Sequence, residues 1–181
     1  MNKCLIALTV PALLLGACAA NQSPSAASPR TVTMATDQQA SAMLGKIKSL
    51  EGEWTMTHDG KTQVASVFTV SSSGSVVREV MFPGSPHEMT NVYHMDGPDL
   101  IMTHYCAGGN QPRMRCTAAK GDVYDLRFDS VTNLGDTSKP YMAEMTLTIK
   151  DADHISQAWR SYQNGQLCKE HMPVFELTRK K

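Results

Sequence analysis

A predicted hairpin over residues 87–106 carries the side chains best suited to bind a small molecule. Side chains alternate between the two faces of a strand, so a turn at 96–99 places five of them on one face. These five are Met89, Asn91, Tyr93, Met102 and His104. Ligand pockets are typically apolar with a few polar groups, which is the composition of this face. If the face points inward, the sequence predicts a pocket for a small, largely apolar molecule.

The same residues also allow a second interpretation. Buried polar groups need hydrogen-bond partners, and Asn91, Tyr93 and His104 can find them in one another within a solid core. With its interior filled, the protein would instead act through its outer surface, by binding a protein partner.

The sequence identifies no catalytic residue, metal ligand or cofactor. His104 and Cys106 are about 7 Å apart along a strand, whereas direct proton transfer needs about 3 Å. The chain contains none of the motifs of serine hydrolases, zinc proteases or nucleotide-binding loops. Neighbouring His and Met residues, such as His171-Met172, suit copper(I), but Met is also a common core residue. Catalysis or metal binding through His104 therefore stays an alternative.

One helix and a long series of strands must position these residues. Residues 35–48 have apolar side chains at helical spacing, with Asp37 as the expected N-cap. After residue 50, short segments rich in Val, Thr, Tyr, Phe and Met alternate with turn dipeptides such as Asp59-Gly60. The expected strands are 52–58, 61–71, 75–82, 87–95, 99–106, 112–120, 123–129, 141–150, 154–162 and 166–179. This pattern predicts a mainly β fold: an antiparallel up-and-down β-barrel of about 8–10 strands preceded by one short α-helix.

The N-terminus resembles that of a bacterial lipoprotein. Lys3 precedes an apolar stretch over 5–15 that is too short to span a bilayer and is typical of a secretory signal. The following Leu15-Gly16-Ala17-Cys18 resembles the lipobox, in which the cysteine takes the lipid.

The lipoprotein resemblance implies three segments: a signal peptide over 1–17, a tether over 18–35 and a β-barrel domain over 36–181. The tether is expected to be flexible because it has almost no large apolar side chain. Lipidated Cys18 would hold the protein to a membrane of the cell envelope. Ala19, rather than Asp, after the lipidated cysteine implies the outer membrane, facing the periplasm, in a Gram-negative host.

Export would bring the remaining cysteines into an oxidising compartment. Cys106 and Cys116 flank a glycine-containing loop on adjacent predicted strands. Directly opposed strand positions approach disulfide distances, so the sequence allows a Cys106–Cys116 bridge as well as two free thiols.

Gly52-x-Trp54, directly after the helix, resembles the G-x-W signature that opens the barrel of lipocalins and related calycins. In those families a cation from the last strand lies across the Trp and closes the barrel, and Arg179 has the matching position here. Ten strands fit the fatty-acid-binding and nitrobindin-like branches better than true lipocalins. Nitrobindin-like barrels bind haem through a His, so haem is a further alternative, although no family motif maps onto a specific His of this chain.

Charge excludes one class of partner. The chain has 17 basic and 17 acidic residues, and its basic side chains cluster only at residues 179–181. Nucleic-acid binding needs a basic surface, so no nucleic-acid partner is expected. The sequence as a whole predicts a lipid-anchored envelope protein whose barrel binds a small hydrophobic ligand. The alternatives are a packed barrel that binds a protein partner in the envelope, and a haem-binding, metal-binding or enzymatic barrel that uses His104.

Overall fold

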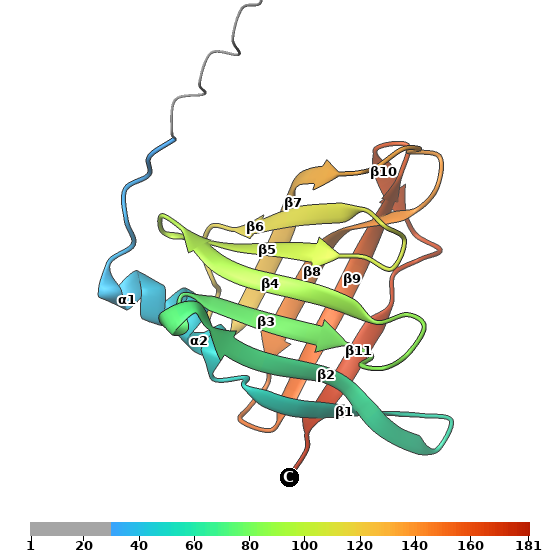
Figure 1. The fold of residues 1–181 in the computed structure, drawn as a ribbon, viewed down its shortest axis with the longest axis horizontal. Coiled ribbons are helices and arrows are strands. Elements are labelled where there is room, and N and C mark those ends of the chain that lie inside the picture. The colour runs from blue at the N-terminus through green and yellow to red at the C-terminus, as the bar shows by residue number, and fades with distance from the viewer. Residues whose placement is uncertain (1–29) are drawn as a thin grey trace, which may run out of the picture. The chain divides into compact units, whose positions relative to one another are not determined.

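The strands expected from the sequence close into one antiparallel barrel (Figure 1). A computed structural model describes residues 30–181 of the chain. The chain divides into two units, Met1–Thr31 and Val32–Lys181, and every element below belongs to the second. The expected signal peptide, the lipobox with Cys18, and the tether as far as residue 29 lie outside the described residues.

Ten antiparallel strands form the barrel wall, each beside its neighbour in sequence until the last strand returns to the first. The strands are β1 (Gly52–His58), β2 (Lys61–Ser71), β3 (Val76–Met81), β4 (Met89–Asp96), β5 (Asp99–Tyr105), β6 (Gln111–Cys116), β7 (Val123–Thr132), β8 (Tyr141–Ile149), β9 (His154–Gln163) and β11 (Val174–Arg179). β11 pairs with both β9 and β1, which closes the barrel. The predicted fold class is therefore confirmed.

The expected last strand, 166–179, is two strands. β10 (Gln166–Cys168) and β11 both pair with β9, β10 at residues 161–163 and β11 at 154–158. Between them, residues 169–173 leave the sheet, and Pro173 at the end of this segment has no backbone N–H to give to a ladder. This break matters because the segment borders the cavity described below.

The leading helix covers one end of the barrel. It consists of α1 (Asp37–Ala40), a π-helical turn over Ser41–Gly45 and α2 (Lys46–Lys48). Its N-cap is Thr36 rather than the expected Asp37: the Thr36 hydroxyl accepts from the Gln39 backbone N–H (3.2 Å), and the Gln39 side chain accepts from the Thr36 N–H (2.9 Å). In the described part of the chain, no helix has the length and apolar character needed to cross a bilayer.

The helix docks through the apolar side chains of Met43, Leu44 and Ile47, all of which are buried. Tyr124 of β7 also donates a hydrogen bond to the Ala42 carbonyl (2.8 Å). The apolar spacing seen in the sequence thus marks the face of the helix that packs on the barrel.

The β4–β5 hairpin has the predicted register. Asn91 pairs with His104 and Tyr93 with Met102. These four side chains are at most 1% exposed, so the face expected to point inward does so. Met89, at the start of β4, is partly exposed.

The possible disulfide between Cys106 and Cys116 is not formed, and both residues have free thiols. Cys116 pairs with Leu100, at one end of β5, whereas the Cys106 N–H bonds to the Asn110 carbonyl at the other end. Six residues of strand, about 20 Å, separate the two cysteines. The expectation of opposed positions was wrong because the turn is short and β6 starts at Gln111, so Cys106 and Cys116 lie at opposite ends of the hairpin.

Candidate functional site

An apolar cavity of about 320 Å³ lies at the end of the barrel where β3 and β5 end and β4 and β11 begin, which we call the mouth. In Figure 1 the ends of β3 and β5 point away from the helix. β11 runs between the two ends: Phe175 near its start lines the cavity, while Arg179 at its end lies at the closed base. The cavity wall consists of Met81, Met89, His104, Met142, Trp159 and Phe175. Three side chains border it from the rim, namely His87, Cys106 and His171. Below this level, buried apolar side chains pack together in the barrel interior.

Beneath the cavity, a fully buried acidic residue collects four hydrogen bonds. Glu79 of β3 accepts from Ser66 (2.6 Å) and Gln157 (2.7 Å) at one carboxyl oxygen. The other oxygen accepts from the amide of Asn91 and the phenol of Tyr93, both at 2.8 Å. Burial, followed by the nearby Glu79, raises the pKa of Tyr93 well above its ordinary value, so the phenol keeps its proton. The four donors satisfy the carboxyl oxygens in an otherwise apolar interior.

This network determines which nitrogen of His104 carries its proton. Because the Asn91 amide N–H donates to Glu79, the Asn91 carbonyl oxygen faces His104 Nδ1, 2.7 Å away. A carbonyl oxygen only accepts, so Nδ1 carries the hydrogen and Nε2 carries the lone pair. Burial lowers the pKa of His104 to about 4, so the imidazole is neutral near pH 7.

Two buried polar atoms on cavity-lining residues have no hydrogen-bond partner among residues 30–181: His104 Nε2 and Trp159 Nε1. The His104 and Trp159 rings are in contact, with centroids 4.8 Å apart, and both residues are at most 2% exposed. One atom is an acceptor and the other a donor. A buried polar atom without a partner costs about 1–3 kcal/mol, a cost that a ligand group paired with it would recover.

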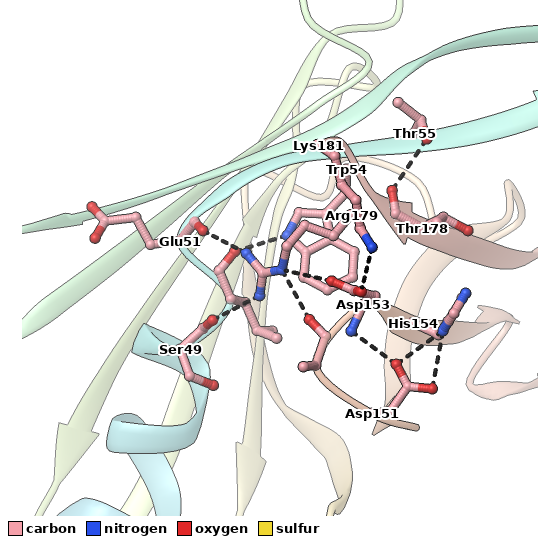
Figure 2. A network of polar contacts seen from close by, with 12 residues as sticks. Ser49, Glu51, Trp54, Thr55, Asp151, Asp153, His154, Thr178, Arg179 and Lys181 are labelled. Carbon is pink, nitrogen blue, oxygen red and sulfur yellow. Dashed lines mark hydrogen bonds and ion pairs between the residues drawn. The ribbon is translucent and has the colours of Figure 1, made fainter.

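The closed end of the barrel is different, because its polar groups are paired. The Arg179 guanidinium lies over the Trp54 indole, 4.4 Å from the ring centroid, as the calycin resemblance implies (Figure 2). It donates to the carbonyls of Ser49, Glu51 and Ala152 at 2.8–2.9 Å. The Trp54 N–H donates to the Leu50 carbonyl (2.8 Å).

A polar hollow of about 390 Å³ lies beside this closed end. Its charged residues are satisfied locally: Lys46 pairs with Asp122 (2.9 Å), and Asp151 pairs with His154 (2.9 Å). Because these polar side chains already have partners, this hollow is a weaker candidate for a binding site than the mouth.

The structure divides the five predicted ligand-binding residues into two groups. Met89 and His104 line the cavity. Asn91, Tyr93 and Met102 lie deeper in the packed interior, where the first two hydrogen-bond to Glu79 and Asn91 orients His104. They therefore support the site from below.

Sequence reasoning did not find Glu79 or Trp159. Strand parity is a signal for Glu79, because it lies two residues from Val77 and from Met81 on β3 and so shares their buried face. Parity also places Trp159 on the inward face of β9 with Ile155 and Gln157, but it does not reveal the contact with His104, which crosses the barrel from β9 to β5.

Within the described residues, no three His, Cys, Asp or Glu side chains are placed to hold a metal ion. The arrangement instead offers one neutral imidazole acceptor and one indole donor inside an apolar wall. No protein-family model matches the chain, and no curated protein matches it.

Proposed function

We propose that the protein binds a small, largely apolar molecule in the cavity at the barrel mouth. The observation that carries this proposal is the cavity itself: about 320 Å³, walled by methionine, tryptophan and phenylalanine side chains. This volume is at the lower end of the range for small-molecule pockets, about 300–1,000 Å³. The buried side chains packed together beneath it give the cavity a floor.

A titration with naphthalene, a neutral apolar probe, tests this function. We expect saturable binding to the wild-type protein, measured by the fluorescence of the probe. Met89→Trp, which adds bulk to the cavity wall, should weaken binding at least tenfold. Met34→Trp is the matched control, because Met34 is 78% exposed and is not among the residues that line the cavity. Absence of saturable binding, or equal affinities for the two variants, would contradict the proposal. Native mass spectrometry of the purified protein would then identify any natural ligand that remains bound.

Haem is a second candidate, favoured by the state of His104. A metal-ligating histidine commonly donates one ring N–H to a fixed acceptor and binds the metal through its other nitrogen. His104 has the first of these features, because its Nδ1–H donates to the Asn91 carbonyl oxygen. A haem brings its own iron and needs a single imidazole from the protein. Titration with haemin should then produce a sharpened Soret band that His104→Phe abolishes; an unchanged spectrum removes this candidate.

We further propose that the protein works in the cell envelope, attached through a lipid on Cys18. This proposal rests on the lipobox-like Leu15-Gly16-Ala17-Cys18 and on the apolar segment before it. Cells fed radiolabelled palmitate should label the wild-type protein and leave the Cys18→Ser variant unlabelled. Labelling of the variant would refute lipidation at this residue.

A further inference from the structure

We infer that the cavity selects apolar molecules that carry a neutral hydroxyl group. This inference rests on the proposed binding function and names its ligand class. Two residues that line the cavity each contribute a buried polar atom without a hydrogen-bond partner among residues 30–181, the acceptor His104 Nε2 and the donor Trp159 Nε1–H. A hydroxyl group has the matching pair of roles, since its O–H donates and its oxygen accepts.

The tautomer of His104 is determined by two residues that do not line the cavity, Asn91 and Glu79. Asn91 accepts the Nδ1–H, and Glu79 in turn accepts from the Asn91 amide. The neutral imidazole therefore carries only a lone pair at Nε2, so this nitrogen can accept a hydrogen bond but cannot donate one. A ligand whose polar group cannot donate leaves Nε2 unpaired.

Other common polar groups fit this pair less well. An ether or ester oxygen only accepts, so it can satisfy Trp159 but not His104. An ammonium group only donates, so it can satisfy His104 but not Trp159. A carboxylate also only accepts, so it leaves His104 unpaired, and it would bring a charge into a largely apolar site. A carboxylic acid has both roles only when protonated, which near pH 7 it is not.

The contact between the two rings supports a shared ligand group. Their centroids are 4.8 Å apart with the planes tilted by 54°, so the two polar atoms belong to adjacent parts of one wall. The methionine and phenylalanine side chains of the wall give the rest of the ligand an apolar surface, while His87, Cys106 and His171 lie at the rim. The expected ligand is therefore a compact hydrocarbon skeleton with one hydroxyl at its buried end.

A matched series of naphthalenes tests this inference on the purified full-length protein. The probes are 2-naphthol, 2-methoxynaphthalene, naphthalene and 2-naphthoate, which share one ring system and differ in the polar group. We expect 2-naphthol to bind at least tenfold more tightly than each of the other three near pH 7, measured by fluorescence titration. Without a partner for its hydroxyl, 2-naphthol would bind more weakly than naphthalene, because burying an unpaired hydroxyl is unfavourable.

Two variants locate the source of the preference. His104→Phe keeps a ring in the wall but removes Nε2, and it should bring 2-naphthol and 2-methoxynaphthalene within about threefold of each other. Trp159→Phe keeps an aromatic ring and removes the donor, and it should reduce the preference for 2-naphthol over naphthalene. His58→Phe is the matched control, because His58 is exposed at the end of β1 and does not line the cavity. Circular dichroism should be used to check that each variant is folded. If His104→Phe is unfolded, the result for Trp159→Phe decides the test.

The outcomes separate the two proposals. If naphthalene binds as tightly as 2-naphthol, the cavity takes apolar ligands but does not recognise a hydroxyl, and the inference fails while the proposed function stands. If no member of the series binds saturably, the proposed function fails. A preference for 2-naphthol that survives both His104→Phe and Trp159→Phe would overturn the assignment to these residues.

Discussion

The two ends of the barrel each contain a buried tryptophan beside a nitrogen-rich side chain, but they use it differently. At the closed base, Trp54 donates its N–H to Leu50 and lies under Arg179, which is itself bonded to three carbonyls. At the mouth, Trp159 contacts His104, and neither His104 Nε2 nor Trp159 Nε1 has a hydrogen-bond partner among the described residues.

This difference in hydrogen bonding indicates that the base has a structural role and that the mouth is suited to binding. Satisfied polar groups stabilise a fold, whereas unsatisfied ones cost free energy that a ligand can recover. The base therefore closes the barrel, and the mouth keeps two polar positions open. The four predictions below test this contrast, from the largest expected effect to the smallest.

Replacing the acid beneath the mouth should have the largest effect. Glu79→Leu leaves the donors of Ser66, Asn91, Tyr93 and Gln157 buried without their acceptor. At about 1–3 kcal/mol for each unsatisfied group, we expect a loss of at least about 4 kcal/mol in the free energy of unfolding, measured by urea denaturation. Glu170→Leu, at an exposed position, should change it by about 0.5 kcal/mol or less. A loss below about 1 kcal/mol for Glu79→Leu would show that the network is not needed.

Lowering the pH should reduce the free energy of unfolding, because His104 at the mouth becomes protonated more readily in the unfolded chain. The pKa of this histidine is about 4 in the folded state, against an ordinary 6.5, so between these values the unfolded chain binds more protons. The contribution of His104 to stability is therefore fully present above pH 6.5 and is lost as the pH falls to 4, by about 3 kcal/mol.

Urea denaturation at several pH values measures this effect. The His104→Phe variant should lose less stability than the wild type over the same range, because it lacks the titrating group. Parallel pH profiles for the two proteins would contradict the assignment to His104.

The same substitution at the two tryptophans compares the two ends directly. Trp54 and Trp159 are both at most 2% exposed, and Phe removes the indole N–H from each. Trp54→Phe breaks a hydrogen bond and leaves the Leu50 carbonyl unpaired, whereas Trp159→Phe removes a donor that has no partner. We expect Trp54→Phe to lower the free energy of unfolding by about 1–3 kcal/mol more than Trp159→Phe does. Equal losses would mean that the two indoles are equivalent.

The smallest expected effect concerns the cation at the base. Arg179→Lys keeps the charge near Trp54 but loses the planar guanidinium that reaches three carbonyls. We expect the free energy of unfolding, measured by urea denaturation, to fall by about 1 kcal/mol, with no change in the affinity for naphthalene at the mouth. Arg127→Lys, at a side chain that is 58% exposed, is the control and should be nearly neutral. A change in ligand affinity for Arg179→Lys would show that the two ends are coupled.

The sequence by itself determined the local elements of this protein. Strand periodicity and turn dipeptides predicted β1 and β2 with their observed bounds, and the turn at 96–99 predicted the register that pairs Asn91 with His104. The G-x-W signature placed Trp54 opposite Arg179. Each of these depends on neighbouring residues or on a known motif, because side-chain alternation and turn geometry act over short distances.

Only the tertiary structure decided which inward residues meet across the barrel. It brought Gln157 of β9 to Glu79 of β3, placed Trp159 against His104, and separated Cys106 from Cys116. It also placed the apolar cavity at the mouth. The physical reason is that closing the barrel joins strands that lie far apart in the sequence, and the stagger of all ten strands together determines which side chains face each other.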